Sequence, residues 1–314
     1  MEQLIFTHKT PRKHIFVDWD LSSICNYSCH YCGPEAHDGK VPFPNIEDAK
    51  KFVDKVHTEY TTKDFAIYNL LGGEPTIWKE LSIFSSYIKQ VNNKNILQLL
   101  TNGSRSLSWW LTNAESIDRI IVTVHVEHCD IKKIVEKFNN LIGLLDIEFQ
   151  VAIDIDIFDK CIEYYNYAIH YLNKNIGVRP KPLKKNLSKP GMMDYSSTQI
   201  DTIQKLPIID GTHKHRYGSP MKFKNEDVNV VKLITDKKNA WKDWACWIGI
   251  DTINITRSGN VKIGSQCNPN LVIGNIKDCS FSIPMVPVKC NYDSCDCWTD
   301  IHTTKIKNYA GHTI

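Results

Sequence analysis

Eleven cysteines are many for a chain of 314 residues, and most of them fall into two groups. The first group is Cys25, Cys29 and Cys32, in the stretch ICNYSCHYCGP. Closely spaced cysteine thiolates are typical ligands of zinc or iron–sulfur clusters, whereas isolated cysteines are usually small buried hydrophobes. The spacing therefore predicts two metal centres. The second group, near the C-terminus, comprises Cys246, Cys267, Cys290, Cys295 and Cys297.

The first group offers three ligands to a site that normally takes four. A [4Fe–4S] cluster is usually held by four cysteine thiolates, so Cys25, Cys29 and Cys32 would leave one iron without a protein ligand. An open iron of this kind can bind a chelating cofactor. The alternative is a zinc site completed by His30 or His37, which are close in the sequence.

Further motifs follow the ends of the next predicted strands. Tyr31 precedes the third cysteine, a Gly-Gly-Glu-Pro stretch follows the second predicted strand, and Thr-Asn-Gly follows the third. In this order the motifs resemble the radical S-adenosylmethionine (SAM) superfamily. The resemblance implies that Tyr31 lies against the adenine and that the glycine loop receives the methionine amino group. The implied SAM-binding residues are Tyr31, Gly72, Gly73, Glu74, Pro75, Thr101, Asn102, Thr123 and His125.

The resemblance also implies the chemistry of the first cluster. An electron passes through the [4Fe–4S] cube to the sulfonium of SAM, and the resulting 5′-deoxyadenosyl radical abstracts a hydrogen atom from the substrate. The protein positions the reactants and excludes water. The implied partner is an electron donor similar to flavodoxin or ferredoxin. For Thr123 and His125, an ordinary role at the end of a strand is an equal alternative.

The second cysteine group surrounds a predicted β-hairpin. The stretch IDTINITRSGNVKIG alternates apolar residues around a turn at 257–260, which brings Cys246 and Cys267 to the same end of the hairpin. The group resembles the twitch/SPASM class of auxiliary-cluster domains, which implies one auxiliary [4Fe–4S] cluster. The full seven-cysteine SPASM set is absent. Four of the five cysteines would ligate the cluster, with Cys246 and Cys267 favoured; a structural zinc ribbon is the alternative.

The elements that must position these groups alternate between strand and helix. Six alternations between residues 14 and 183 predict a parallel α/β unit, and the resemblance implies a partial (β/α)6 barrel of the radical SAM type. Ligands bind at the carboxyl ends of parallel strands, so the motifs should meet there. The predicted strands are 14–22, 65–71, 96–100, 119–125, 148–154 and 178–183. The predicted helices are 46–60, 78–91, 106–115, 131–145 and 158–172.

Composition divides the chain into three parts. Residues 1–183 form the predicted radical SAM core. Residues 184–240 are polar and read as a bridging segment with one helix near 197–204. Residues 241–314 form the predicted auxiliary domain, a small cysteine-rich domain with a β-hairpin.

Three further sets of residues are weaker candidates. Cys129 follows the fourth predicted strand and could return a hydrogen atom to a substrate radical, although packing is the commoner role. The acids Asp154, Asp156 and Asp159 follow the fifth strand, where one could act as a base or bind a substrate amine; stabilising a helix N-terminus is the alternative. Basic residues at 179–189 and 213–216 could attract a phosphate or carboxylate, or simply face solvent.

Composition narrows the class of protein. The formal charge of +3 is too small to imply nucleic-acid binding by itself. No run of 18 apolar residues predicts a membrane span, and no secretory signal is visible, so a cytoplasmic protein without membrane partners is expected. Only 24 residues precede Cys25, which is too few for an N-terminal leader-binding module.

Fold and cofactor do not determine the substrate. We expect a small or medium substrate that is oxidised, epimerised or rearranged with help from the auxiliary cluster. The alternatives are maturation of a ribosomally made peptide or protein, hypermodification of a nucleobase or nucleotide, and a non-catalytic iron–sulfur or zinc protein.

Overall fold

The computed structural model describes residues 4–6, 12–185, 192–212, 221–223, 226–227, 230–265, 267, 272–295 and 297–313. The basic segment 213–216 and residues 186–189 of the other basic stretch lie outside these ranges. Within them, no helix combines the length and apolar character needed to cross a membrane.

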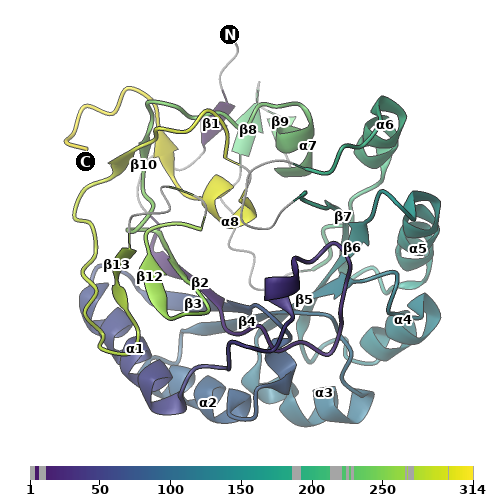
Figure 1. Cartoon of the computed structure of the whole chain (residues 1–314), viewed down its shortest axis with the longest axis horizontal. Coiled ribbons are helices and arrows are strands. Elements are labelled where there is room, and N and C mark those ends of the chain that lie inside the picture. The colour runs from purple at the N-terminus through teal and green to yellow at the C-terminus, as the bar shows by residue number, and fades with distance from the viewer. Residues whose placement is uncertain are drawn as a thin grey trace.

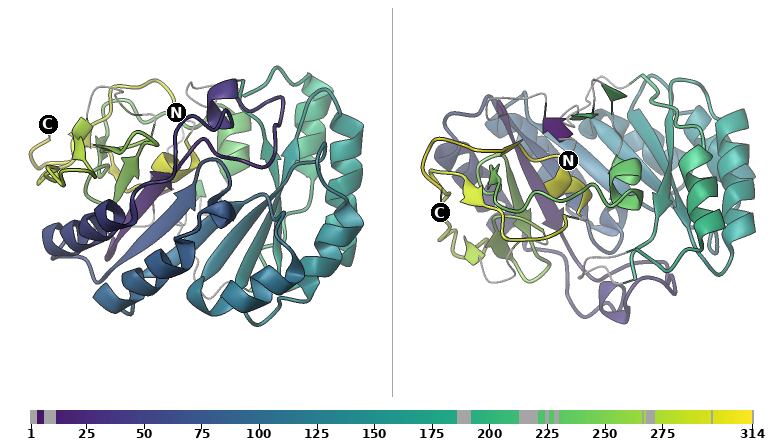
Figure 2. Two further views of the ribbon diagram at one scale, coloured as in Figure 1. Left: turned by 60° about the horizontal axis from the view of Figure 1, so that its bottom comes forward. Right: turned by 90° about the horizontal axis from the view of Figure 1, so that it is seen from above.

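A curved parallel sheet forms the centre of the molecule, and its strands follow one another in chain order. Each strand pairs in parallel with the next, and the connecting helices cover the outer face of the sheet (Figures 1 and 2). The partial (β/α)6 barrel is therefore confirmed. Its strands are β2 (His14–Asp20), β3 (Phe65–Leu71), β4 (Ile96–Thr101), β5 (Arg119–Val124), β6 (Asp146–Ile153) and β7 (Gly177–Pro182). Its helices are α1 (Ile46–Glu59), α2 (Leu81–Val91), α3 (Leu107–Asn113), α4 (Ile131–Asn139) and α5 (Phe158–Tyr171).

The strands alternate between an apolar outer face and a polar inner face. Trp19 of β2 points outward, where its ring packs edge-on against Phe52 of α1 at 5.0 Å and Phe84 of α2 at 5.6 Å. Its neighbour Asp18 points to the other face, as successive strand residues must. The apolar outer face therefore packs against the helices, and the inner face carries the polar side chains.

Two helices are shorter than their apolar patterns predict. The helix expected over 78–91 begins at Leu81, because Pro75–Ile77 forms a separate 3-10 turn directly after the glycine loop. The helix expected over 131–145 ends at Asn139, and Gly143 in a left-handed conformation turns the chain into β6. Periodicity did not show these ends because the apolar residues beyond them also pack on the core.

The predicted hairpin is present but extends the central sheet. Its strands are β11 (Thr252–Ile255) and β12 (Asn260–Lys262), and β11 pairs in parallel with β2. The strand β13 (Val272–Asn275) adds to β12, so that in the described chain nine strands form one sheet in the order β13-β12-β11-β2-β3-β4-β5-β6-β7. The hairpin therefore shares backbone hydrogen bonds with the barrel. The predicted boundaries at 183 and 240 stay predictions.

The segment between barrel and hairpin holds more structure than its polar composition suggests. The expected helix is present as α6 (Ser197–Lys205), capped by Ser196 and Gln199. A second helix, α7 (Val230–Thr235), and a small antiparallel sheet of β1 (Leu4–Phe6), β8 (Met221–Phe223) and β9 (Glu226–Asp227) were not predicted. Near the C-terminus, β10 (Ala245–Cys246), β14 (Val288–Lys289) and β15 (Lys305–Ile306) form another small sheet, and α8 (Trp298–Ile301) lies between β14 and β15 in the chain.

A buried ion pair joins the barrel to the hairpin, and its removal should destabilise the whole protein. Lys63 Nζ lies 2.8 Å from Asp251 Oδ1, and the two side chains are 4% and 0% exposed. The substitution Lys63→Met strands a buried carboxylate and should lower the free energy of unfolding by about 3–5 kcal/mol in urea denaturation. The control Lys205→Met removes an exposed pair with Asp201 and should cost less than about 1 kcal/mol. Equal small effects in the two variants would show that this ion pair does not stabilise the protein.

Candidate functional site

The first cysteine group lies on the loop that follows β2. The loop is folded by its own backbone: the Cys32 N–H donates to the Cys29 carbonyl at 3.0 Å, and the Tyr27 N–H donates to Cys25 Sγ at 3.4 Å. All eleven cysteines are within the described ranges, and all are free thiols. Burial raises the pKa of the thiols of Cys25, Cys29 and Cys32. Three protonated thiols held together suit a cationic metal cluster, which would displace their protons.

The glycine loop packs directly against the cysteine loop. The Glu74 N–H donates to the carbonyl of Ile24, the residue before Cys25, at 2.9 Å. A Cβ on Gly73 would lie 2.1 Å from that same carbonyl oxygen, and a Cβ on Gly72 would lie 1.8 Å from Asp20 Oδ1. Both glycines adopt a positive φ. Only glycine permits this approach of two backbones.

Asp20 supplies an acceptor that the sequence did not reveal. Its Oδ2 pairs with Arg257 at 3.0 Å, while its Oδ1, beside Gly72, is buried and accepts no hydrogen bond within the described chain. A buried acceptor without a donor is costly unless a ligand supplies one. An ammonium group such as that of the methionine part of SAM fits this position. The available signal was a carboxylate at the end of the first strand.

Both carboxylate oxygens of Glu74 accept hydrogen bonds from other residues of the protein. Its Oε1 accepts from the Thr76 hydroxyl at 2.6 Å and the Thr101 hydroxyl at 2.7 Å, and its Oε2 accepts from the Asn102 N–H at 2.7 Å. Asn102 in turn donates from its amide to Asn26 Oδ1 at 2.9 Å, next to Cys25. Glu74 therefore ties the loops after β3 and β4 to the cysteine loop. Its contact with an ammonium group stays a prediction.

Tyr31 and His125 meet beside the second cysteine. The Tyr31 hydroxyl lies 2.6 Å from His125 Nδ1, and Cys29 Sγ lies 3.2 Å from the same nitrogen. The two rings are stacked with an interplanar angle of 8°. Burial lowers the pKa of His125 to about 3, so its imidazole is neutral. The structure thus brings Tyr31 and His125 together at the cluster loop, although they are far apart in the sequence.

Adding one methyl group to the glycine loop should disrupt the site. In Gly73→Ala the new Cβ would meet the Ile24 carbonyl, so the loop must move away from the cysteines. We expect a loss of about 2–4 kcal/mol in stability and at least tenfold weaker SAM binding by calorimetry. The control is Gly143→Ala, which also has a positive φ but has nothing within 4 Å of the new Cβ. It should cost about 1 kcal/mol and leave SAM binding unchanged. SAM binding that is equal in both variants would contradict this placement.

Comparisons with known proteins agree with this arrangement. No protein-family model matches the sequence. The probable GTP 3',8-cyclase of Sulfurisphaera tokodaii is 28% identical over 193 residues, which cover 61% of this chain and 51% of the relative. The chain thus spans about half the length of that relative. A probable GTP 3',8-cyclase of Saccharolobus islandicus is 30% identical over 153 residues, 48% of this chain and 42% of its own length.

Two solved structures share the fold. A polyhistidine-tagged form of anSMEcpe with bound AdoMet has a TM-score of 0.53 at 15% identity, over 84% of this chain and 78% of that chain. Streptococcus suis SuiB bound to precursor peptide SuiA has a TM-score of 0.52 at 11% identity, over 86% and 65%. At such identities the likeness concerns the fold, and the curated relatives supply the link in sequence. The chain belongs to the radical SAM superfamily.

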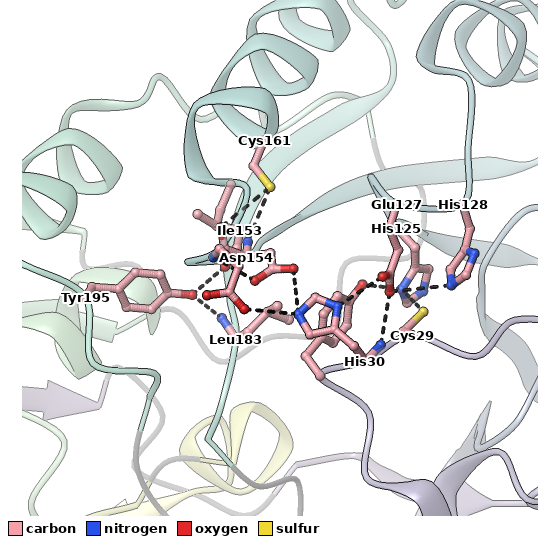
Figure 3. A network of polar contacts seen from close by, with 12 residues as sticks. Cys29, His30, His125, Glu127, His128, Ile153, Asp154, Cys161, Leu183 and Tyr195 are labelled. Atoms are coloured by element: carbon pink, nitrogen blue, oxygen red, sulfur yellow. Dashed lines mark hydrogen bonds and ion pairs between the residues drawn. The ribbon is translucent and has the colours of Figure 1, made fainter.

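In this radical SAM protein, His30 does not complete the cysteine site. Both nitrogens of its ring are directed at carboxylates, those of Glu127 and Asp154 (Figure 3). This arrangement disfavours the zinc alternative in which His30 is the fourth ligand. Glu127, two residues beyond His125, was not predicted; its only signal was its place shortly after the fourth predicted strand.

The inner face of the barrel carries a chain of buried polar side chains. The Asn69 amide donates to Asp18 Oδ1 at 2.6 Å, and the Gln98 amide donates to Asn69 Oδ1 at 2.7 Å. Burial raises the pKa of Asp18 to about 7. Thr299 of α8 donates to Asp18 Oδ2 at 3.3 Å, so the C-terminal segment reaches the barrel interior. These residues were missed because single polar residues in apolar strands carry no motif.

The predicted basic residues after β7 differ in their surroundings. Arg179 pairs with Glu148 at 3.1 Å, and Lys185 pairs with Asp194 at 2.5 Å. Lys181 instead donates to the Thr123 hydroxyl at 3.3 Å inside the barrel, and burial lowers its pKa to about 8. Thr123 and Lys181 therefore lie together in the barrel interior. Cys32 is nearby, and after burial it has the largest effect on the pKa of Lys181, which it raises.

Four cysteines of the second group gather around the small C-terminal sheet. Cys246 lies on β10, Cys290 follows β14, and the backbone N–H of Cys295 donates to the Asn239 carbonyl. Burial raises the pKa of Cys246 to about 12, with further contributions from the thiols of Cys295 and Cys290. A hydrogen bond with Cys295 and burial raise the pKa of Cys267. Cys295 thus acts on each of Cys246, Cys267 and Cys290, and a set of four such thiols suits a single four-ligand centre.

Cys297 has charged neighbours in the barrel as well as in the C-terminal segment. Burial raises the pKa of its thiol most, and the carboxylates of Asp300 and Asp18 raise it further. Lys184 lowers it. Asp18 belongs to the barrel interior, and Lys184 follows β7. Cys297 therefore lies where the C-terminal segment meets the barrel.

Cys129 lies between the outer helices and the cysteine loop, since its thiol also acts on Tyr27 of that loop. Its carbonyl accepts from the Tyr164 hydroxyl of α5 at 3.2 Å, and the charged neighbours of its thiol are Asp130, Lys160 and Lys137. Burial raises the pKa of this thiol to about 12. These surroundings favour packing, and hydrogen donation by Cys129 stays a prediction.

Proposed function

We propose that this radical SAM protein is an enzyme that reductively cleaves SAM and abstracts a hydrogen atom from a small or medium substrate. The observation that carries the proposal is the meeting of three loops at the carboxyl edge of the barrel: the cysteine loop after β2, the glycine loop after β3 and the Thr-Asn-Gly loop after β4. Each loop contributes a different part of one binding site.

The residues of these loops divide the binding of SAM between them. Cys25, Cys29 and Cys32 hold a [4Fe–4S] cluster, and the backbone of the glycine loop with Asp20 receives the methionine part. Tyr31 and His125 present flat neutral rings beside the cluster loop, on which the adenine can lie. When bound, the cluster and SAM supply an electron-driven cleavage that yields a radical able to abstract hydrogen.

The second cysteine set holds one auxiliary [4Fe–4S] cluster in this proposal. Its ligands are Cys246, Cys267, Cys290 and Cys295, because their thiols interact with one another. Lys305 stabilises the negative charge of such a centre: it is buried, acts on Cys246 and is held by the carbonyls of Ile301 and Thr303 at 3.2 and 3.1 Å.

The barrel interior favours a polar substrate of limited size. Asp18, Asn69 and Gln98 offer donors and acceptors, and α8 of the C-terminal segment contacts Asp18 from the open end. A nucleotide is the second candidate, because curated relatives are named GTP 3',8-cyclases and the buried ammonium of Lys181 can attract a phosphate. Oxidation, epimerisation and rearrangement all fit a radical formed beside such a polar surface.

Reductive cleavage provides the test. The anaerobically reconstituted protein should contain about eight iron atoms per chain, as two [4Fe–4S] clusters require, and should release 5′-deoxyadenosine from SAM and dithionite. About four iron atoms with one zinc would overturn the auxiliary cluster. Absence of 5′-deoxyadenosine from fully loaded protein would overturn the enzyme. Incubation with deuterated GTP tests the nucleotide candidate. Mass spectrometry should then find deuterium in the 5′-deoxyadenosine, and ordinary GTP is the control.

A further inference from the structure

A second kind of metal-ligand geometry lies at the mouth of the barrel, beside the first cysteine group but without any of its thiols. It involves His30 on the cysteine loop and two carboxylates at the end of β6. His30 Nε2 lies 3.1 Å from Asp154 Oδ2 and 3.5 Å from Asp156 Oδ2. These three atoms all lie within 4.8 Å of one another. Figure 3 shows His30 reaching across to Asp154 from the opposite loop.

The distances between these atoms match one shared ion. A divalent ion about 2.1 Å from each of two ligands separates the ligand atoms by about 3.0 Å at an octahedral angle and about 3.4 Å at a tetrahedral angle. The two separations measured from His30 Nε2 are of this size. An imidazole nitrogen with two carboxylate oxygens is also a ligand set for divalent first-row metals.

Asp154 gives an independent indication of a missing ligand. Its side chain is 1% exposed, and its Oδ2 accepts no hydrogen bond from the described residues, although it is aimed at His30 Nε2. Burying a carboxylate oxygen in this way is unfavourable unless a cation compensates it. Within the described chain the basic group that pairs with Asp154 and Asp156 is the imidazole of His30, with no lysine or arginine beside it.

The surroundings hold the ligands in place. His30 Nδ1 lies 3.0 Å from Glu127 Oε2, and a carboxylate on the second nitrogen is the usual support of a metal-binding histidine. Asp154 Oδ1 accepts from the Asp156 N–H at 3.1 Å, which fixes the two acids relative to each other. The end of β6 is anchored by Tyr195, whose hydroxyl donates to the Ile153 carbonyl and accepts from the Leu183 N–H (Figure 3).

We propose that His30, Asp154 and Asp156 bind one divalent metal ion of the manganese or iron(II) class, with Glu127 as the positioning residue of His30. Three protein ligands leave coordination positions open. His30 and Asp156 are 46% and 74% exposed at their side chains, so those positions face the barrel mouth. The ion would hold an oxygen ligand of the substrate, such as a carboxylate, phosphate or hydroxyl, at the entrance to the interior.

Manganese is the suitable probe, because carboxylate sites accept it while thiolates prefer softer metals. The anaerobically reconstituted protein is equilibrated with Mn²⁺ by dialysis, and bound manganese and iron are counted together. We expect saturable binding of about one manganese per chain. Asp156→Asn and His30→Gln should each weaken this binding at least about tenfold without loss of iron. The control Asp159→Asn, an exposed acid on the same turn, should leave it unchanged.

Two results would overturn the site: no saturable manganese binding by the loaded protein, or binding that Asp156→Asn and Asp159→Asn affect equally. Because Asp156 is exposed, its substitution does not depend on refolding of the barrel. Formation of 5′-deoxyadenosine in the same samples keeps this site separate from the proposed function. Its loss from the unmodified protein would overturn the enzyme, whereas its presence without manganese binding would overturn the ion alone.

Discussion

Cys29→Ala is expected to abolish formation of 5′-deoxyadenosine from SAM. Cys29 is the buried member of the three thiols on the loop after β2, and its Sγ lies 3.2 Å from His125 Nδ1. Alanine removes one of only three protein ligands, and two thiolates do not hold a [4Fe–4S] cluster. Iron should fall from about eight to about four atoms per chain, because the second cysteine set is unaffected. Product formation should drop to the background seen without protein.

The matched control for this variant is Cys279→Ala. Cys279 is a partly exposed free thiol outside both groups, and its Sγ contacts the Ile276 carbonyl at 3.4 Å. This variant should keep its iron and its product. If Cys29→Ala retains all its iron and cleaves SAM, the first cluster is not on this loop.

Cys295→Ser and Cys297→Ser should differ in iron content, although the two residues are only two positions apart in the sequence. Cys295 interacts with Cys246, Cys267 and Cys290, so its loss should remove the auxiliary cluster and about four iron atoms per chain. The charged neighbours of Cys297 are Asp300, Asp18 and Lys184; Asp300 also lies 3.7 Å from Cys267 Sγ, whereas Asp18 and Lys184 belong to the barrel. Cys297→Ser should therefore retain about eight iron atoms and both cluster signals in electron paramagnetic resonance.

The pair of variants decides the ligand set directly. Both substitutions replace a buried sulfur by a smaller oxygen, so their effects on packing are matched. Loss of iron from Cys297→Ser with retention in Cys295→Ser would exchange the two assignments. Full iron in both variants would show that neither Cys295 nor Cys297 is a required ligand, and would overturn the ligand set proposed for the auxiliary cluster. SAM cleavage by Cys295→Ser should persist, because the first cluster is held by a separate loop.

The barrel was predictable because its signals are local. The strand at 65–71 and the starts of the helices at Ile46, Ile131 and Phe158 follow from apolar runs and caps such as Asn45. The ends of helices were less predictable. Before Leu81 and after Asn139, apolar residues pack on the core from outside the helix, in a pattern that a longer helix would also show.

The site divides in the same way. Cys25, Cys29, Cys32 and the glycine loop were found from their spacing, because one short loop must carry all the ligands of one centre. The contacts of Asp20, Glu127 and Thr299 depend on residues from distant parts of the chain, and no sequence spacing predicts them. The same applies to the surroundings of Cys129, whose carbonyl accepts from Tyr164 of α5 and whose thiol acts on Tyr27 of the cysteine loop.

The sequence by itself determined the superfamily, the barrel and the three-cysteine loop, because periodicity and short motifs are properties of neighbouring residues. Only the tertiary structure decided that the hairpin extends the barrel sheet, that Cys295 and Cys297 face different surroundings, and that His30 meets Asp154. These are pairings between distant segments. Their geometry depends on how the strands align and which faces are buried, and a pattern along the chain does not record that.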